Sequence, residues 1–455
     1  MTKTGSGKPA NEGNRSAPGA REIVLDVLLE ILEKKQYSHL AKYQYLDKQE
    51  RSFIKRTVDG TLERLMQVDC LIESYSSVKL RKMKPVIRTI LRMSVYQICF
   101  MDRIPDSAAC NEAVKLAVRR GFSGLKGFVN GVLRNVSRHK DEITWPDDST
   151  AFCLPQWIFS MWERQYGKEA AKTMAESFLK ERPLTVRMNL SLASREEIFD
   201  SLESQGVKIR ESGFAEDVVF LSQVDYLESL DAFLDGWIQV QDLSSSLAGD
   251  AAGVKEGDYV IDVCGAPGGK SLHIAELLHG TGMVEVRDLT EKKIALVEDN
   301  IWRSGFSNIE ARVQDATEFD PDSQEKADLL IADLPCSGLG IIGRKPDIRY
   351  NVTEEQTREL AKLQREILFV VWRYVKPGGT MVFSTCTVDP AENEENVRWI
   401  LSQLPFEPGD LTDRIGDALA ETLLEDTRKK GYVQLLPGFY PGDGFFISVF
   451  RRKEE

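Results

Sequence analysis

The C-terminal half of the chain alternates short apolar runs with longer amphipathic ones, and this rhythm limits the possible folds more than any other feature. It predicts strands at Tyr259–Val263, Met283–Val286, Ile309–Val313, Ala327–Ala332 and Thr380–Phe383, then two closing strands at Tyr432–Leu436 and Phe445–Phe450. Helices are predicted at Gly269–Leu278, Glu291–Arg303, Glu354–Val375 and Asp389–Leu401. Such alternation builds a doubly wound, mostly parallel α/β sheet, so we expect residues 242–455 to form a Rossmann-like domain.

The rest of the 455-residue chain is too long for the same hydrophobic core and divides into further parts. Apolar residues at helical spacing predict an all-α bundle over residues 21–139. Residues 140–150 are predicted as a linker and residues 151–241 as a small α+β piece. Residues 1–20 lack an apolar signal core and are predicted to be a disordered tail. No apolar run is long enough to span a bilayer, so we expect a cytoplasmic protein without a membrane partner.

Charge is distributed unevenly along the chain. Residues 1–140 carry 26 Lys and Arg against 14 Asp and Glu, a net +12, whereas residues 141–455 carry 33 against 57, a net −24. Basic residues cluster at Lys79, Arg81, Lys82, Lys84, Arg88 and Arg92, and again at Arg119, Arg120, Lys126, Arg134 and Arg138. Solvated helix faces would explain part of this excess, but a basic bundle also attracts phosphate. We therefore expect the bundle to bind RNA.

Cysteine and histidine usage argues against a metal site or a disulfide framework. The seven cysteines show no Cys-x-x-Cys pair, and the four histidines do not cluster. His273 and His279 are predicted to lie on the solvent face of one helix. Cys70, Cys99, Cys110 and Cys153 are predicted to be buried as small apolar residues. We expect no metal ion.

A glycine-rich turn follows the first predicted strand. Its residues are Cys264, Gly265, Ala266, Pro267, Gly268, Gly269 and Lys270, followed by Ser271. A Walker A loop needs Gly-x-x-x-x-Gly-Lys-Ser/Thr, but the residue five before Gly269 is Cys264, and Gly265 is one position too close. The dinucleotide fingerprint Gly-x-Gly-x-x-Gly fails as well. A strand, a tight glycine turn and a helix remain, which let the backbone approach a nucleoside closely.

Aspartates follow the next three predicted strands. Asp288 lies about twenty residues past the turn, where an acidic residue commonly takes ribose hydroxyls. Asp315 is expected near the base of the nucleoside, and Asp333 nearer the reacting centre. Each aspartate alone could be a helix cap or a solvated loop residue. Together with the turn they fit S-adenosylmethionine better than ATP.

Two cysteines come just beyond predicted strands, at the sheet edge where ligands gather. Cys336 stands in Asp333-Leu334-Pro335-Cys336-Ser337-Gly338, and Cys386 in Ser384-Thr385-Cys386-Thr387. A thiolate that adds to C6 of cytosine makes C5 nucleophilic enough to take a methyl group. Lys270 is a candidate for lowering the pKa of the reacting thiol, and Asp333, held protonated, is a candidate acid. The pattern does not order the two thiols.

These runs resemble the signatures of the Sun/nucleolar-protein family of RNA cytosine-5 methyltransferases. The similarity extends to Gly236–Asp242 and Gly444–Ile447, while Arg92–Gln97, Asn111–Val114 and Phe128–Arg134 resemble the NusB antitermination fold. The pairing is similar to the bacterial members that act on small-subunit (16S) ribosomal RNA. Two residues depart from the family pattern: Gly265 replaces the usual alanine, and Ser271 the usual threonine.

The resemblance implies a class I methyltransferase fold, an S-adenosyl-L-methionine cofactor and a ribosomal RNA substrate. It implies that Cys386 is the nucleophile and that Cys336 assists release of the methylated base. Cofactor contacts are implied for the turn from Cys264 to Lys270 and for Asp288, Asp315 and Asp333. We expect a monomer.

Two alternatives remain open from the sequence. Gly-Gly-Lys-Ser after an apolar strand suggests a P-loop-like NTPase, which the one-residue spacing error disfavours. A non-catalytic RNA-binding assembly factor would use only the basic bundle, with the pocket as a structural element. Nucleotide hydrolysis would support the first alternative, and RNA binding without turnover the second.

Overall fold

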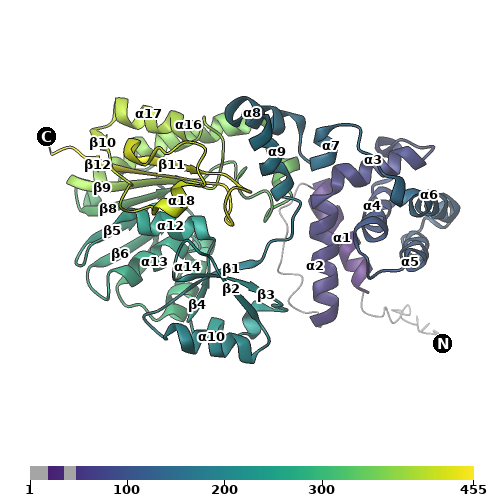
Figure 1. Cartoon of the computed structure of the whole chain (residues 1–455), viewed down its shortest axis with the longest axis horizontal. Coiled ribbons are helices and arrows are strands. Elements are labelled where there is room, and N and C mark those ends of the chain that lie inside the picture. The colour runs from purple at the N-terminus through teal and green to yellow at the C-terminus, as the bar shows by residue number, and fades with distance from the viewer. Residues whose placement is uncertain (1–18, 35–47, 455) are drawn as a thin grey trace, which may run out of the picture. The chain divides into compact units, whose positions relative to one another are not determined.

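The computed structural model describes residues 19–34 and 48–454 (Figure 1). The expected disordered tail at residues 1–20 therefore lies almost entirely outside the described residues. The chain forms two compact units, Met1–Cys153 and Leu154–Glu455. In the described ranges, no helix has both the length and the apolar character needed to cross a membrane.

The first unit is a helical bundle, as predicted. Its helices are α1 (Ala20–Lys34), α2 (Lys48–Glu63), α3 (Leu65–Tyr75), α4 (Pro85–Phe100), α5 (Asp106–Arg119), α6 (Lys126–His139) and α7 (Asp148–Phe152). One core unites α1 to α6, with α4 contributing fully buried Ile90, Leu91 and Met93. Pro85 occupies the first turn of α4, where its missing N–H leaves no bond unmade. The expected linker contains a short 3₁₀ turn, Lys140–Glu142, and the start of α7.

Part of the basic cluster in this unit has a structural role. Arg92 donates two hydrogen bonds to Asp69, at 2.7 and 2.6 Å. Arg88 pairs with Glu33, and Arg120 with Asp26 at 2.8 Å. The exposed members of the two basic clusters are Lys79, Arg81, Lys82, Lys84, Arg119, Lys126, Arg134 and Arg138.

The second unit begins with the predicted α+β piece. It contains α8 (Gln156–Tyr166), α9 (Lys168–Ser177), β1 (Leu184–Met188), α10 (Arg195–Ser204), β2 (Lys208–Glu211), β3 (Val218–Ser222), α11 (Asp231–Leu234) and β4 (Ile238–Val240). The strands form an antiparallel sheet in the order β2-β3-β1-β4. Ser194 and Glu197 form a capping box at the start of α10. The sequence analysis did not predict α8.

A larger mixed sheet forms the rest of the second unit. Its strands are β5 (Tyr259–Asp262), β6 (Met283–Asp288), β7 (Ile309–Val313), β8 (Ala327–Asp333), β9 (Val375–Thr385), β10 (Phe406–Pro408), β11 (Tyr432–Leu435) and β12 (Phe445–Arg452). Their order is β10-β12-β9-β8-β5-β6-β7, with β11 also paired to β12. Strands β5 to β9 are parallel, and the C-terminal strands are antiparallel. The predicted doubly wound, mostly parallel sheet is confirmed.

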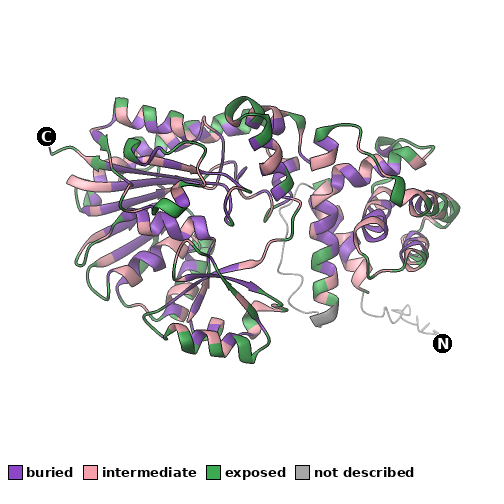
Figure 2. Ribbon diagram, in the orientation of Figure 1, coloured by how far each residue is buried: buried purple, intermediate pink, exposed green. Residues whose placement is uncertain are grey.

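Helices cover both faces of this sheet. They are α12 (Leu243–Ala252), α13 (Gly269–Leu277), α14 (Glu291–Ser304), α15 (Ile348–Asn351), α16 (Glu354–Val371), α17 (Glu394–Gln403) and α18 (Asp417–Ala420). Side chains of α12, α13 and α14 share one core with Val260 of β5, whereas α16 and α17 share another with Ile261. Neighbouring residues of a strand point to opposite faces, so both cores are filled by one strand. Figure 2 shows the strands buried beneath partly exposed helices.

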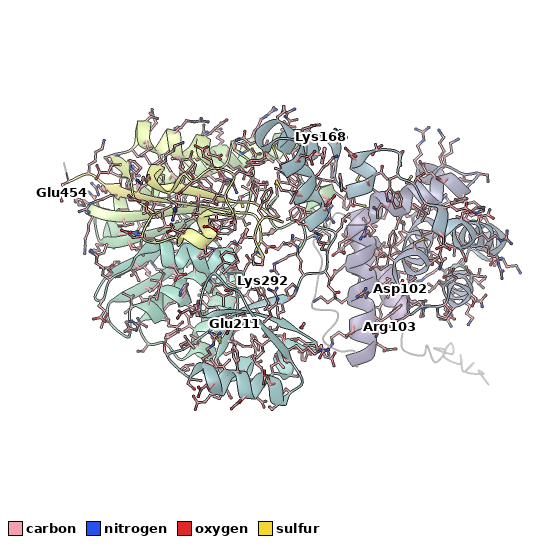
Figure 3. All side chains as sticks on the ribbon, viewed as in Figure 1. Asp102, Arg103, Lys168, Glu211, Lys292 and Glu454 are labelled. Carbon is pink, nitrogen blue, oxygen red and sulfur yellow. The ribbon has the colours of Figure 1, made fainter. Side chains whose placement is uncertain are left out.

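Two expectations for this unit were wrong. Helix α17 begins at Glu394 rather than Asp389, because Asp389 accepts a hydrogen bond from the N–H of Ala391 in a separate turn. His273 is buried rather than on a solvent face, and its Nε2 lies 3.3 Å from Oδ1 of Asp250. Helix α13 packs on β6 and β7 beside α12, and His273 lies on its buried side. Exposed charges such as Lys168, Glu211 and Lys292 lie on other elements (Figure 3).

Candidate active site

The two candidate cysteines lie at the carboxyl edge of neighbouring strands. β8 pairs in parallel with β9, with Asp333 opposite Ser384. The loops that follow these strands therefore start side by side, although they are fifty residues apart in the sequence. Sγ of Cys336 lies 3.3 Å from Sγ of Cys386. Both are free cysteines.

The environments of the two thiols differ. The hydrogen bond with Cys386, together with burial, raises the pKa of Cys336 well above its ordinary value. A thiol that holds its proton this firmly is a hydrogen-bond donor rather than a nucleophile. Either sulfur can be the hydrogen-bond donor in the contact between Cys336 and Cys386.

A cation lies beside the same pair of loops. Nζ of Lys270 is 2.6 Å from Oδ2 of Asp333, and Oγ of Ser384 donates to Oδ1 of Asp333 at 2.7 Å. Burial alone would lower the pKa of Lys270, but the charge of Asp333 and its hydrogen bond outweigh burial and raise it. The ring of Phe445 lies 5.0 Å from Nζ and adds a cation–π contact. Lys270 is therefore a permanent positive charge in the site.

The glycine turn is folded tightly against the sheet. The N–H of Gly265 donates to the carbonyl of Arg287 at 2.9 Å, and Gly268 has a φ of +103°, in the left-handed region. A Cβ on Gly265 would lie 2.5 Å from Cγ1 of Val286 and 2.7 Å from Oδ2 of Asp262. Alanine at this position requires those side chains to move, which gives the departure at Gly265 a local physical basis.

Asp288 and Asp315 lie where the sequence predicted, after β6 and β7. Asp288 is buried, its Oδ2 accepts from the N–H of Ala266, and its Oδ1 accepts from Lys293 at 2.8 Å. The carboxylate is therefore held against the glycine turn. Asp315 uses Oδ1 to accept two hydrogen bonds from Thr317. Its position fits the prediction, but one of its oxygens serves a local turn.

Beneath the turn, Asp262 is a buried acid that the sequence analysis did not select. Burial raises the pKa of Asp262 to about 7 despite a hydrogen bond from Ser271, and the charge of Asp333 adds to the rise. The hydroxyl of Ser271 thus supports the floor of the turn, a role that threonine would also fill. Burial, followed by the charge of Asp262, raises the pKa of Cys264. Cys264 is therefore a neutral thiol.

Comparison with known proteins agrees with this geometry. Residues 252–451 match the model of the 16S rRNA methyltransferase RsmB/F family. Residues 18–138 match the NusB family, and residues 154–225 match the ferredoxin-like domain of RsmF/B-like methyltransferases. A probable ribosomal RNA small subunit methyltransferase B from Bacillus subtilis (strain 168) is 36% identical over 449 residues, covering 95% of this chain and 98% of the relative. The chain belongs to the RsmB/F methyltransferase family.

Further relatives agree. A probable ribosomal RNA small subunit methyltransferase B from Synechocystis is 30% identical and covers 95% of this chain and 99% of its own. The crystal structure of PH0851 matches with a TM-score of 0.80 at 24% identity, covering 96% of this chain and 100% of its own. NSun6 from Pyrococcus horikoshii, solved with SFG, matches with a TM-score of 0.58 at 22% identity over 66% of this chain and 98% of its own. These two structures show the shared fold.

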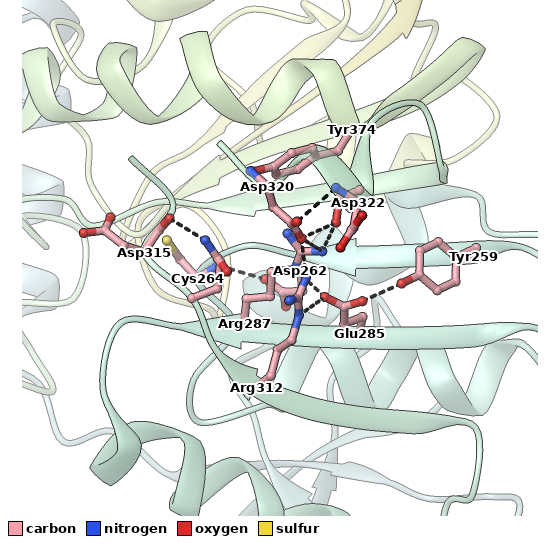
Figure 4. A network of polar contacts seen from close by, with 12 residues as sticks. Tyr259, Asp262, Cys264, Glu285, Arg287, Arg312, Asp315, Asp320, Asp322 and Tyr374 are labelled. Atoms are coloured by element: carbon pink, nitrogen blue, oxygen red, sulfur yellow. Dashed lines mark hydrogen bonds and ion pairs between the residues drawn. The ribbon is translucent and has the colours of Figure 1, made fainter. Parts of the chain in front are cut away.

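In this RsmB/F chain, charged side chains lie on β6 and β7 near the glycine turn. Glu285 on β6 accepts hydrogen bonds from Tyr259, Arg287 and Arg312 (Figure 4). Burial alone would raise the pKa of Asp320, but hydrogen bonds from Ser323 and Arg312 outweigh burial and lower it to about 2. Only a 3₁₀ turn, Pro321–Ser323, connects β7 to β8, so this network takes the place of a crossover helix.

Several residues that shape the site were missed by sequence reasoning. Asn300 of α14 donates a hydrogen bond to the carbonyl of Pro267 at 2.9 Å and so holds the glycine turn. Glu392 and Asn393 lie beneath the cysteine loops, six and seven positions after Cys386. Ser384 stood inside the quoted Ser-Thr-Cys run, so its position was a usable signal. Asn300 had none, because a helix does not reveal which loop it touches.

The residues described by the structure contain no cluster of three or more metal-ligating side chains. The P-loop alternative finds no support in the geometry either. A P-loop lysine reaches toward phosphates over its own turn. Lys270 instead reaches across the sheet edge to Asp333.

Proposed function

We propose that the chain methylates C5 of a cytosine in small-subunit ribosomal RNA, using S-adenosyl-L-methionine and a transient bond between Cys386 and C6 of the base. The observation that carries the proposal is the pairing of Cys336 and Cys386, 3.3 Å apart, beside Lys270 and Asp333. Family membership supports the methyl transfer, and the names of the relatives support the ribosomal RNA substrate.

The turn and the carboxylates fit the proposed cofactor. Gly265 leaves no space for a side chain, and Asp288 is held against the turn by the N–H of Ala266. A carboxylate can accept about four hydrogen bonds, so Asp288 retains capacity for ribose hydroxyls. S-adenosylmethionine, when bound there, supplies an electrophilic methyl group. The structural relative solved with SFG, an analogue of this cofactor, supports the same pocket.

The residues then act in sequence. The Cys386 thiolate forms a bond to C6, and the electron pair displaced from the C5–C6 bond makes C5 nucleophilic. Asp333 is proposed to meet the polar edge of the ring and to give a proton to N3 from its protonated form, with Lys270 no longer paired to it. After C5 carries the methyl group, its proton must leave. Removal of that proton returns the electron pair to C5–C6 and expels Cys386.

Cys336 is proposed to assist this release. Its sulfur lies next to Cys386, on the loop that follows Asp333. The raised pKa of Cys336 keeps it protonated while Cys386 attacks. Once Cys386 is bonded to carbon, that sulfur no longer stabilises the Cys336 thiol by accepting its hydrogen bond as a thiolate. Cys336 is proposed to lose its own proton to solvent at that point and, as a thiolate, to accept the C5 proton.

Substitution of each thiol tests the order of roles. Cys386→Ala should abolish methylation of unmodified small-subunit RNA, with a loss of at least about 10³-fold in kcat. Cys336→Ala should accumulate a covalent RNA–protein adduct that migrates slowly on a denaturing gel. Radiolabelled methyl transfer, followed by nucleoside analysis for 5-methylcytosine, measures the first effect. Methylation at an unchanged rate in Cys386→Ala would reject the mechanism.

A matched substitution controls for thiol loss. Cys110→Ala removes a buried thiol of the helical unit and should leave both methylation and the adduct unchanged. If Cys336→Ala gives no adduct while Cys386→Ala is inactive, the release role alone is rejected.

A further inference from the structure

A buried pair of side chains, Glu392 and Asn393, lies directly under the two cysteine loops. Both residues are 0% exposed and occupy the turn before α17. The proposed reaction does not use either of them. A buried carboxyl without hydrogen-bond partners destabilises the fold. The partners of the Glu392 carboxyl therefore indicate its role.

Glu392 holds the residue that follows Cys336. Its Oε2 accepts the N–H of Ser337 at 2.9 Å, and its Oε1 accepts the hydroxyl of Ser337. Gln364 of α16 adds two hydrogen bonds to this set. Its Nε2 donates to Oε2 of Glu392 and to the carbonyl of Pro335, each at 2.9 Å. Cys336 is therefore fixed by polar contacts on the residue before it and on the residue after it.

Asn393 holds Cys386 in the same manner. Its Oδ1 accepts the hydroxyl of Thr385 at 2.6 Å, and its Nδ2 donates to the carbonyl of Thr387 at 3.1 Å. One hydrogen bond lies on each side of the cysteine. Glu392 and Asn393 are adjacent in the chain. The hydrogen bonds that hold the Cys336 loop and those that hold the Cys386 loop therefore start from the same short piece of backbone.

A third contact joins the two loops directly. The hydroxyls of Ser337 and Thr387 lie 2.7 Å apart. Ser337 donates to Glu392, so its oxygen accepts from Thr387. This chain leads from Glu392 through Ser337 to the Cys386 loop without a gap in the hydrogen bonding.

We propose that Glu392 and Asn393 are positioning residues that set the distance between the Cys336 and Cys386 sulfurs, with Glu392 controlling the release thiol and Asn393 the attacking thiol. Neither side chain touches the reacting atoms. Each acts by fixing the backbone on both sides of one cysteine. Misplacement of a reacting group by about 1 Å can slow a reaction by about 10²-fold, so such fixing matters.

The first test measures sulfur geometry without any methylation. Diamide, a thiol oxidant, takes two hydrogens from a close thiol pair and leaves a disulfide, whose formation depends strongly on geometry. In the full-length wild type it should link Cys336 to Cys386, detected by mass spectrometry of the peptides. Glu392→Ala should slow this linkage by about tenfold or more, by the same sensitivity to position. Glu392→Gln, which keeps an acceptor and can donate to Ser337, should restore most of the rate.

The second test separates the role of Glu392 from that of Asn393. Its interpretation rests on the proposed function. In a single turnover with RNA and cofactor, Glu392→Ala should still transfer methyl but accumulate the covalent adduct. Asn393→Ala should instead form little adduct and lose methyl transfer by about 10- to 100-fold. KM for the cofactor should stay within about twofold in both variants, because neither residue contacts the glycine turn.

Glu395→Ala is the matched control. Glu395 is exposed on the same helix, and its nearest cation is Arg365 at 3.8 Å, so both readouts should remain at the wild-type level. If Glu392→Ala does not fold, Ser337→Ala breaks the link between the loops with the backbone N–H intact and should also slow the disulfide. Wild-type rates of disulfide formation in both Glu392→Ala and Ser337→Ala, or equal loss of adduct formation and release in the Glu392 and Asn393 variants, would overturn the proposal. If the wild type forms the disulfide but never methylates RNA, the proposed function is rejected, while the positioning roles of Glu392 and Asn393 are retained.

Discussion

Single residues in this site depend on charges that are removed from water. Burial alone would lower the pKa of Lys270, but Asp333, whose carboxylate lies 2.6 Å away, outweighs burial, and the pKa is raised. Asp262, at the end of β5 next to β8, shows the opposite balance: its burial is not offset, and its pKa rises to about 7. The glycine turn thus separates two residues of opposite behaviour. The pKa of Lys270, after the turn, is raised, and that of Asp262, before the turn, lies at about 7.

Asp262 should make stability depend on pH. Its folded pKa of about 7 lies above its ordinary value of 3.8, so the folded state keeps a proton that the unfolded state has lost between these values. The wild-type free energy of unfolding should therefore fall as pH rises from about 4 to about 7. Asp262→Asn cannot titrate and should lack this fall. Between pH 5 and pH 8 the wild type should lose about 1 to 3 kcal/mol more than the variant.

Urea denaturation at the two pH values, with the signal of the second unit followed separately, measures this difference. Parallel losses in the wild type and in Asp262→Asn would show that Asp262 is already ionised at pH 5 in the folded state.

At the scale of elements, the loop after β8 and the loop before β12 cross each other beside Cys386. The N–H of Gly340 donates to the carbonyl of Cys386 at 3.1 Å, and the N–H of Gly444 donates to the carbonyl of Gly340 at 2.9 Å. A Cβ on Gly340 would lie 2.0 Å from the carbonyl oxygen of Gly444, which is backbone and cannot swing away. The crossing is possible because both positions lack a side chain.

Gly340→Ala should therefore separate the two loops. We expect a stability loss of about 1 to 3 kcal/mol from overpacking and a fall of about tenfold or more in kcat as Cys386 is displaced. Thermal denaturation and methyl-transfer assays measure the two effects. Gly416→Ala serves as the control, because a Cβ there meets nothing within 4 Å, and its stability should change by less than about 0.5 kcal/mol. A wild-type kcat in Gly340→Ala would show that the crossing does not position Cys386.

At the scale of the whole chain, opposite charges are carried by different units. Residues 1–140 have a net charge of +12 and residues 141–455 a net charge of −24, as counted above. Within the first unit, Arg88, Arg92 and Arg120 are engaged with acidic partners, so they support the bundle itself. The exposed lysines and arginines are what remains to attract a polyanion across an otherwise acidic protein.

Removing part of that exposed charge should weaken RNA binding and its dependence on salt. The variant replaces by alanine four exposed residues around one short 3₁₀ turn: Lys79, Arg81, Lys82 and Lys84. Affinity for unmodified small-subunit RNA should fall about tenfold near 0.1 M salt, and the slope of log K against log salt should lessen by up to about 3. Filter binding over a salt series measures both values.

Replacement of Lys115 and Lys362 by alanine is the control for loss of charge, since each already pairs with a glutamate. An equal loss of affinity in the control would mean that overall charge, and not this segment, attracts the RNA.

The sequence by itself determined the architecture of this protein. The spacing of apolar residues, and the glycines and prolines that end helices and strands, are local properties of the chain. Strand and helix periods predicted the bundle, the α+β piece and the parallel sheet, and the glycine turn with its aspartates predicted a nucleoside pocket rather than a P-loop. The same local signals placed Cys336 and Cys386 at strand ends. They could not show that β8 and β9 are neighbours, which is why the order of the two thiols came only from family resemblance.

Only the tertiary structure decided how those thiols are held and protonated. The hydrogen bond with Cys386, together with burial, raises the pKa of Cys336, and burial raises the pKa of Asp262. Both causes depend on what packs against a residue in the folded chain, which no window of sequence contains. His273 was misplaced for this reason, and Glu392 and Asn393 were overlooked. The side chains of Glu392 and Asn393 contact the loops after β8 and β9, which lie at the same edge of the sheet although Ser337 is distant from Glu392 in the sequence. Contacts of that kind arise from strand order, and strand order is a property of the folded chain.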